Sequence, residues 1–442
     1  MKIFDAAVIG GGILGCFAAR SLMKYRMSAV LIEAEPDVCT GITRANTAVV
    51  YPGYDHHPGS RKAEMTVRAC ASFGRLCGAL EVPFSRCGSL MTACGERGEA
   101  VLRKKLEQGR RNGVPGLRLL SGDAARDLEP MLSGEVVAAL EAPSAGTVNP
   151  WQLGIAAYEN ARANGCEALF RARVVSVEAD GALYRIGTER GEIAARAVIN
   201  CAGTSAVRVQ EMLCPSPVRL RLDGADFLVL DPAAAKPGRI LFEETETGKG
   251  ITAVPCTEGN LLLDSPPRPY RPDFATTAEG LAEIRNHASR LLPGLDLTAV
   301  IRSFGGVRPN PEGADGRSIR DFCIQRPAPG FWSLVGVKTP GLTCAAELGD
   351  FLAGQCAEML EKETNDAFRP ERRAIRSAPD APVVCQCQKV RRDAVREAIR
   401  RGAVSFDGVK RRTGCGMGRC QGSRCAWEVG EMLRENGHDG TI

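Results

Sequence analysis

The chain opens on apolar and polar blocks that predict a strand, a helix and a second strand. Residues 4–10 (FDAAVIG) form a short apolar run, and an apolar helical stretch follows from Cys16 to Met23. Residues 28–33 (SAVLIE) form a second apolar run that ends in an acid. Short apolar runs bounded by turn residues are typical of buried strands in a parallel sheet. The first 33 residues therefore predict a β-α-β unit.

Glycines fill the turn between the first strand and the helix with G-x-G-x-x-G spacing. In a dinucleotide-binding unit, Gly10 would make the tight turn and Gly12 would let backbone N–H groups approach a pyrophosphate. Gly15 would let the helix pack closely on the strand, and Glu33 would accept hydrogen bonds from ribose hydroxyls. The alternative is a glycine turn that holds no ligand.

Later segments predict more strands of the same sheet. Residues 168–178 alternate between apolar and polar positions, and residues 192–200 and 332–336 form apolar runs. Pro340–Thr343 is expected to begin a helix that ends near Leu360. The acidic run at residues 243–246 is interpreted as a solvated turn.

The order of these segments predicts an α/β protein with a discontinuous, Rossmann-like nucleotide-binding domain, an α+β substrate domain and a small cysteine-cluster domain. The expected limits are residues 1–80, 146–214 and 304–364 for the first domain, 81–145 and 215–303 for the second, 365–381 for a linker, and 382–442 for the third.

Composition is that of an ordinary globular protein. The length of 442 residues is more than one compact domain usually contains. The residues are 44% hydrophobic and 25% charged, a composition that excludes long disordered segments. The apolar stretches are shorter than the roughly 18 residues that a membrane span needs, and the first residues fit a strand better than a signal peptide. The 18 cysteines are scattered singly and then cluster near the end. That pattern indicates reduced cytosolic thiols and a metal site.

The last cysteines form two close pairs. Cys385 and Cys387 stand two positions apart, and Cys420 and Cys425 stand five apart. Four thiolates in two pairs suit a [2Fe-2S] cluster because each pair can hold one iron. A structural zinc site is the alternative, although the glycine-rich stretch around these residues favours a cluster. Cys415 is a fifth candidate that could replace Cys420.

Positive charge concentrates in the same region. Residues 381–442 contain twelve Lys and Arg but seven Asp and Glu, which accounts for the whole net charge of +5. A cluster with four thiolate ligands is anionic, so nearby positive charge would stabilise it, which explains the excess of basic residues. The remaining basic residues could form a docking face for an acidic redox partner, so nucleic-acid binding is not expected.

Several motifs together resemble a known superfamily. They are the opening unit and residues 43–55 (TRANTAVVYPGYD), 58–59 (PG), 198–203 (VINCAG), 304–309 (FGGVRP) and 336–343 (GVKTPGLT). These motifs resemble FAD-dependent oxidoreductases of the D-amino-acid oxidase and glycerol-3-phosphate dehydrogenase superfamily. The tail resembles the bacterioferritin-associated ferredoxin-like [2Fe-2S] domain. The combination covers essentially the whole chain and is most similar to the FAD subunits of anaerobic glycerol-3-phosphate dehydrogenases.

The resemblance implies an extended FAD with its pyrophosphate on Gly10, Gly12 and Gly15 and its ribose at Glu33. A helix N-terminus near the flavin would stabilise the anionic reduced ring. The other implied cofactor-binding residues are Thr43, Asn46, Thr47, Val174, Ala202, Gly203, Gly336, Gly341, Leu342 and Thr343.

Flavin chemistry also needs a substrate clamp and a proton acceptor. The resemblance implies that Arg308 binds a substrate phosphate or carboxylate, and Lys338 is expected to assist. The alternatives are a structural salt bridge for Arg308 and a solvated lysine for Lys338. Tyr51, Tyr54 and one of the two neighbouring histidines, His56 or His57, are the candidates for the proton acceptor. Relatives more often have His-Ala-Gly where this chain has Tyr-Pro-Gly at residues 51–53, and a surface position is the alternative for His56.

These features predict an FAD-dependent dehydrogenase that oxidises a small anionic alcohol, with glycerol-3-phosphate as first choice and dihydroxyacetone phosphate as product. Electrons would pass through the [2Fe-2S] cluster to further redox subunits of a hetero-oligomeric complex. The alternatives are a 2-hydroxy acid, amine or opine substrate, or an electron-transfer subunit without a substrate site. The protein is expected in the cytoplasm, with no membrane insertion of its own and membrane association only through its partners.

Overall fold

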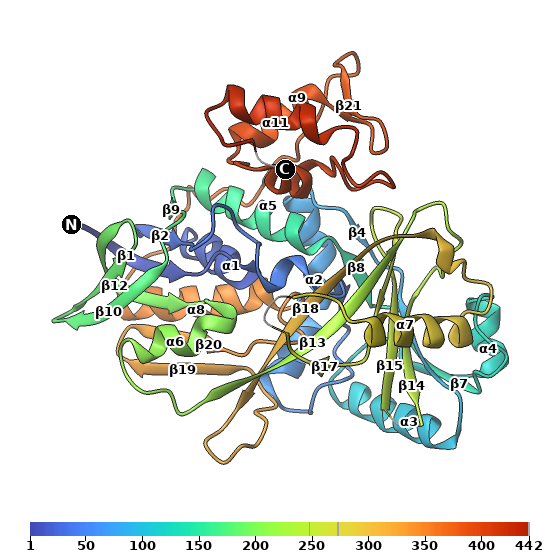
Figure 1. Cartoon of the computed structure of the whole chain (residues 1–442). Helices are drawn as coiled ribbons and strands as arrows, with labels where there is room; N and C mark the ends of the chain where they lie inside the picture. The colour runs from blue at the N-terminus through green and yellow to red at the C-terminus, as the bar shows by residue number, and fades with distance from the viewer. Residues whose placement is uncertain (247, 272–273, 441–442) are drawn as a thin grey trace.

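The structure is a computed structural model that describes residues 1–246, 248–271 and 274–440. In these residues the chain forms two large sheets covered by helices, with a small module at the C-terminal end of the chain (Figure 1). No helix in the described ranges has the length and apolar character needed to cross a membrane.

The first sheet contains the N-terminal β-α-β unit that the sequence predicts. Helix α1 (Ile13–Leu22) connects β1 (Lys2–Ile9) to β2 (Ala29–Ile32), and β1 pairs in parallel with β2 and with β12 (Gly191–Asn200). The strand order is β10-β11-β12-β1-β2-β9, with β20 beside β12 and β19 beside β20. The remaining bounds are β9 Glu167–Leu169, β10 Val174–Asp180, β11 Leu183–Thr188, β19 Cys323–Ala328 and β20 Phe331–Val335.

Four helices share one apolar core with this sheet: α1, α2 (Arg61–Ala79), α5 (Pro150–Ala163) and α8 (Ala345–Met359). Helices α1 and α8 pack closely because a Cβ at Gly349 would lie 2.7 Å from the backbone oxygen of Phe17. The opposite side of the sheet packs against α6 (Ala206–Glu211). The sheet is therefore buried on both faces, as its continuous apolar strands predict.

The single strand expected at residues 168–178 is wrong, because the structure has two strands there. The extended conformation is interrupted at Arg171, whose φ is +53°. The backbone N–H of Arg171 then donates to the Glu35 carbonyl, and that of Ala172 donates to the Glu33 carbonyl. These bonds to the loop after β2 replace the sheet pairing and bring Val174, the first residue of β10, to that loop.

The second sheet has the order β17-β13-β16-β15-β14-β5-β7-β6, with β18 also paired to β13. Neighbouring residues of its strands alternate between two cores, so α3 covers one face and α7 the other. Its elements are β5 Ser89–Ala93, α3 Glu96–Arg111, β6 Arg118–Ser121, α4 Gly122–Leu128, β7 Ala138–Ala142, β13 Arg219–Leu230, β14 Ile240–Thr245, β15 Gly248–Pro255, β16 Leu261–Asp264, β17 Arg268–Pro269, α7 Ala278–Leu291 and β18 Val300–Glu312. The domain limit predicted at residues 303–304 lies inside β18.

The acidic run at residues 243–246 is not a solvated turn, because its first three residues belong to β14. The Glu243 side chain is buried, and its Oε2 lies 2.7 Å from His287 Nδ1 on α7. It also accepts a hydrogen bond from the backbone N–H of Ile251.

A small sheet contains three strands: β3 (Val49–Val50), β8 (Gly146–Val148) and β4 (Phe84–Ser85). Its strands lie in the segments of the chain that connect one large sheet to the other. Short 3₁₀ helices occupy Ile42–Arg44, Gly203–Ser205 and Leu297–Ala299.

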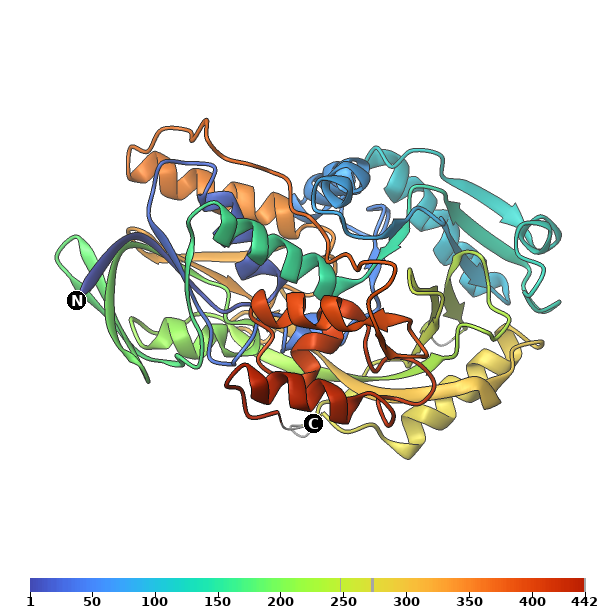
Figure 2. The same cartoon turned by 90° about the horizontal axis from the view of Figure 1, so that it is seen from above.

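The C-terminal module comprises β21 (Val383–Cys385), β22 (Val390–Arg391), α9 (Arg392–Arg400), α10 (Phe406–Thr413) and α11 (Ala426–Glu435). It has its own apolar core. Figure 1 shows it above α5, and the view from above shows it beside α5 (Figure 2). The segment expected to be a linker, residues 365–381, is attached to α5, where the Asn160 side chain donates to the carbonyl oxygens of Arg369 and Glu371.

Candidate functional site

A cavity of about 430 Å³ lies where the two large sheets meet. Its lining includes the carboxyl ends of β1 and β2 from the first sheet and central residues of β13 and β18 from the second. The carboxyl ends of parallel strands are where α/β folds bind nucleotides. The cavity is therefore the natural place for both a cofactor and a substrate.

Most of the cofactor-binding residues that the sequence predicts line this cavity. They are Gly10, Gly12, Glu33, Thr43, Asn46, Thr47, Val174, Ala202, Gly203, Gly341 and Leu342. The predicted residues Gly15, Gly336 and Thr343 are not among its lining residues.

Those three residues shape the backbone next to the cavity instead of lining it. A Cβ at Gly15 would lie 1.8 Å from the Gly10 carbonyl oxygen, so Gly15 permits α1 to pack against the turn. Thr343 is buried, and its Oγ1 accepts a hydrogen bond from the Tyr51 backbone N–H at 3.0 Å. Gly336 has a φ of +64° at the end of β20, a conformation that glycine adopts without strain.

The glycine turn is shaped to receive a phosphate group. Gly10 has a φ of +101°, and a Cβ on it would lie 2.6 Å from the Cys201 carbonyl oxygen. Gly12 is the N-cap of α1 and makes no side-chain cap. Thr43 caps the first helical N–H, that of Ile13, and the N-terminal residues Gly12 to Leu14 line the cavity. Backbone N–H groups and the helix dipole favour an anion at such a terminus. These features fit the pyrophosphate of FAD.

Glu33 fixes one edge of this turn. Its Oε2 accepts a hydrogen bond from the Gly11 N–H at 2.5 Å. Burial raises the pKa of Glu33, while the N–H groups of Glu35 and Gly11 act in the opposite direction. Thr43 fixes the other edge, since its Oγ1 accepts from the Ile13 N–H at 2.9 Å. Glu33 thus lines the cavity directly beside the glycine turn.

The cationic side chains that line the cavity include Arg308 on β18, Lys338 just after β20 and Lys249 on β15. Arg308 Nη2 donates to Thr339 Oγ1 at 2.9 Å, and Lys338 Nζ donates to Asn310 Oδ1 at 3.1 Å. Burial lowers the pKa of Lys338, and the positive charge of Arg308 lowers it further. Neighbouring cations that destabilise one another in this way favour a bound anion.

Lys62 adds a further buried cation behind this group. Its Nζ donates to the Thr339 carbonyl oxygen at 3.2 Å, and its side chain is 4% exposed. Burial lowers the pKa of Lys62 to about 8, and the next contribution comes from the charge of Lys338. The Arg308–Lys338 region therefore carries an excess of positive charge.

The predicted proton acceptors occupy different environments. Tyr51 lines the cavity and stacks on Phe242, with ring centroids 5.9 Å apart. Tyr54 and His56 are buried but do not belong to the cavity lining. Tyr54 packs in the core under α3, and burial raises its pKa. Burial lowers the pKa of His56 to about 4.

Sequence reasoning missed Lys249 and Asp264, which both line the cavity. Lys249 Nζ lies 3.0 Å from Asp264 Oδ2, and Asp264 Oδ1 accepts from the Thr252 N–H. The two residues lie on β15 and β16. No motif marks them, and only the antiparallel pairing of these strands brings them together.

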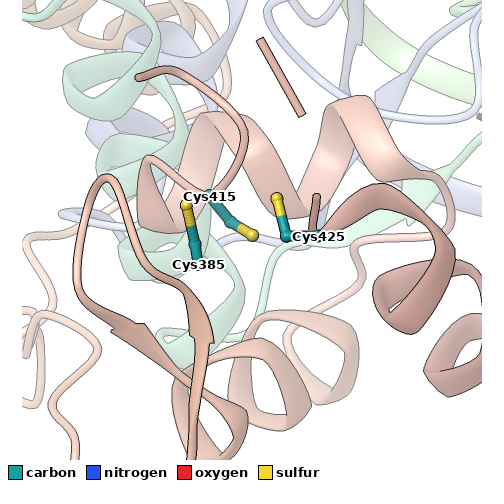
Figure 3. A group of neighbouring side chains, drawn as sticks. All are labelled: Cys385, Cys415 and Cys425. Atoms are coloured by element: carbon teal, nitrogen blue, oxygen red, sulfur yellow. The ribbon is translucent and has the colours of Figure 1, made fainter. Parts of the chain in front are cut away.

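The C-terminal module gathers five cysteines. The sulfur atoms of Cys385, Cys415 and Cys425 all lie within 4.8 Å of one another, as Figure 3 shows (Figure 3). Cys387 Sγ lies 3.5 Å from Cys420 Sγ. The close contacts join the two predicted sequence pairs to each other: Cys385 lies near Cys425, and Cys387 lies near Cys420. Cys415 is adjacent to the first of these contacts.

The thiols of this site differ in ionisation. A hydrogen bond from Cys415 is the largest influence on Cys385 and lowers its pKa. The same hydrogen bond, together with burial, raises the pKa of Cys415. The Gly422 N–H lowers the pKa of Cys420. Thiolates are the ligand form of cysteine, so this donor set fits an iron-sulfur cluster.

Comparison with known families supports both an FAD site and an iron-sulfur site in this chain. Residues 5–355 match the family described as FAD dependent oxidoreductase, and residues 383–435 match the BFD-like [2Fe-2S] binding domain. The chain therefore belongs to the FAD-dependent oxidoreductase family and carries a C-terminal [2Fe-2S]-binding domain. It is an FAD-dependent oxidoreductase with FAD and a [2Fe-2S] cluster as cofactors.

Individual relatives of this chain act on small anionic alcohols, according to their names. The chain is 34% identical to a glycerol 3-phosphate dehydrogenase of Caloramator mitchellensis over 98% of its length and 94% of the relative. It is 26% identical to human mitochondrial L-2-hydroxyglutarate dehydrogenase over 72% of its length and 80% of the relative. Among solved structures, it is similar to the dithionite-reduced, FAD-bound L-α-glycerophosphate oxidase of Mycoplasma pneumoniae. The TM-score is 0.77 at 20% identity, over 84% of this chain and 98% of that one.

Proposed function

We propose that this protein oxidises glycerol-3-phosphate to dihydroxyacetone phosphate. The observation that carries the proposal is the pair of neighbouring cations, Arg308 and Lys338, on the lining of the FAD cavity. A phosphate dianion needs such charge-assisted donors. The similarity to the glycerol 3-phosphate dehydrogenase of Caloramator mitchellensis along nearly the whole chain supports this choice of substrate.

Each lining residue has a role in this proposal. Arg308 and Lys338 hold the phosphate, whereas the charge of Lys249 is balanced by its ion pair with Asp264. Tyr51 is the predicted proton acceptor that lines the cavity, so its oxygen, in the phenolate form, is assigned to take the proton of the reacting hydroxyl. FAD, when bound, supplies the hydride acceptor. The chain's own residues hold the substrate and receive its proton.

The C-terminal module is proposed to pass electrons onward to further redox subunits. A one-electron centre on the same chain suits transfer to another one-electron carrier. We also propose a cytoplasmic location with membrane association through those subunits. Reconstitution with candidate electron carriers would identify the partner by the carrier that restores turnover.

The substrate proposal is tested by comparing Arg308→Met and Lys338→Met with a matched control, Arg317→Met. Arg317 is an exposed arginine whose ion pair is with Asp315. Loss of one charge-assisted clamp costs roughly 1.5–3 kcal/mol, or about 10- to 150-fold in kcat/KM. The first two variants should show this loss with glycerol-3-phosphate and the control should not. Equal kinetics in all three would refute the clamp.

A second candidate substrate is a 2-hydroxy acid, because L-2-hydroxyglutarate dehydrogenase is a relative. The same cations would bind its carboxylates. Anaerobic flavin reduction by L-2-hydroxyglutarate, with no reduction by glycerol-3-phosphate, would select this alternative and leave the FAD chemistry intact. Reduction by neither compound would favour an electron-transfer subunit.

A further inference from the structure

A buried ionic contact joins the C-terminal module to the loop that follows β2. Asp37, 2% exposed, lies on this loop and meets two arginines of α10. Arg412 Nη1 and Nη2 donate to the two carboxylate oxygens at 2.6 and 2.8 Å, and Arg411 Nη2 donates at 2.9 Å. One carboxylate therefore binds both arginines, one of them in bidentate geometry.

The opposite side of the same loop borders the FAD cavity. The loop begins at Glu33 and ends at Thr43, and both residues line the cavity and bind the glycine turn. Between them, the Cys39 N–H donates to the Gly11 carbonyl oxygen at 2.9 Å. Arg411 Nη1 reaches the Cys39 carbonyl oxygen at 3.4 Å. A short stretch of chain thus touches the cofactor site on one side and the module on the other.

Asp37 is the principal acidic partner of both arginines. The next carboxylate, Glu159, lies 4.0 Å from Arg412 and already binds Arg372 and Arg401. The Nε atoms of Arg411 and Arg412 have no hydrogen-bond partner within the described residues. A buried cation that loses its partner is strongly destabilising. Docking of the module in this position therefore depends on Asp37.

We propose that Asp37 couples FAD binding to docking of the C-terminal module. FAD orders the loop from Glu33 to Thr43, which presents the Asp37 carboxylate to Arg411 and Arg412. Docking of the module in turn holds the same loop in its FAD-binding conformation. Linkage requires the two effects to be equal in size. The iron-sulfur module is then fixed on the flavoprotein instead of being a mobile carrier.

The first test measures the FAD affinity of the apoprotein for Asp37→Asn. Its matched control is Asp231→Asn, which removes a different ion pair between the module and the second sheet, Arg419–Asp231 at 3.4 Å. Asp231 is outside the FAD cavity lining. We expect the Kd for FAD to rise at least about tenfold in the first variant, within the usual range of coupling, and by less than about twofold in the control. Equal affinities in both variants and in the wild-type protein would overturn the proposal.

The second test uses the wild-type chain, with its cluster intact, and decides the proposal even when Asp37→Asn does not fold. Limited proteolysis at residues 365–381 is followed with and without FAD. Cleavage there tracks the undocked population, so FAD should slow it at least about tenfold, the coupling expected in the first test. The same cleavage rate with and without FAD would overturn the coupling. Neither test uses a substrate, so both are independent of the proposed function.

Discussion

His56 shows how a single buried side chain departs from its sequence-based interpretation. It is 9% exposed, its carbonyl oxygen accepts from the Asn112 side chain, and its Nε2 has no partner among the described residues. Burial lowers its pKa from 6.5 to about 4. A neutral imidazole is therefore built into the fold, and a proton added to it would have to be accommodated in a buried site.

This arrangement predicts an acid-sensitive contribution to stability. The unfolded chain binds the proton more tightly, so the His56 term lowers the free energy of unfolding as pH falls from about 6.5 to 4. The pKa difference corresponds to about 3 kcal/mol. Denaturant unfolding between pH 4 and 7 should show a shallower pH dependence in His56→Asn. His57→Asn, at an exposed neighbour, serves as the control and should follow the wild-type protein.

Lys62 predicts a pH effect on substrate binding. Its pKa is lowered to about 8, so its positive charge is present below that pH and is lost above it. KM for an anionic substrate should rise about fivefold as pH passes through 8, since a nearby unit charge contributes about 1 kcal/mol. Lys62→Met should have a high KM already at pH 7 and a weaker dependence near pH 8. A wild-type KM that stays flat to pH 9 would contradict this role.

Residues within motifs were predictable, and residues joined only by the sheet were not. Gly10, Gly12 and Arg308 line the cavity as their motifs implied. Lys249 and Asp264 became visible only when β15 and β16 were seen as neighbours. Long-range pairing leaves no local signal in the sequence.

The turn between β1 and α1 gives a matched pair of glycine substitutions. In Gly15→Ala the new Cβ would lie 1.8 Å from the Gly10 carbonyl oxygen, so the turn must distort. In Gly12→Ala the nearest atom is Thr43 Oγ1 at 3.5 Å, an ordinary contact. We expect Gly15→Ala to lose about 1–3 kcal/mol of stability or more. Gly12→Ala should fold with a cost below about 1 kcal/mol but bind FAD weakly, because its methyl group faces the cavity. Thermal melting and FAD titration separate the two effects.

Loops of the C-terminal module bring the cysteines together and predict a spectroscopic pattern. Cys387→Ser and Cys420→Ser should abolish the visible absorbance of the [2Fe-2S] cluster, because their sulfur atoms form one of the two close contacts. Cys415→Ser should retain it. A cluster that survives Cys420→Ser but is lost in Cys415→Ser would show that Cys415 is the ligand.

At the scale of elements, the sequence predicted strands and helices better than their ends. The β-α-β unit follows from apolar runs and glycine spacing. The break between β9 and β10 does not, because alternation continues through Arg171 while hydrogen bonds to Glu33 and Glu35 redirect the chain. Likewise, burial of Glu243 depends on His287 from a distant helix.

At the scale of the molecule, the sequence predicted an order of domains but gave no prediction of the contacts between them. The basic tail was expected to serve the cluster or an acidic partner. Two of its arginines instead bind Asp37, which lies more than 370 positions earlier in the chain. Such a contact depends on the assembled surfaces of two folded units, for which residue spacing gives no prediction.

The central claim is that one chain oxidises an anionic alcohol and passes the electrons to its own iron-sulfur module. The most direct measurement is an anaerobic titration of the purified protein with glycerol-3-phosphate, with the flavin band and the cluster's electron paramagnetic resonance signal followed together. The account predicts that the flavin band bleaches and that the signal of the reduced cluster then appears. A flavin that stays oxidised at saturating glycerol-3-phosphate, in protein that dithionite reduces fully, would contradict it.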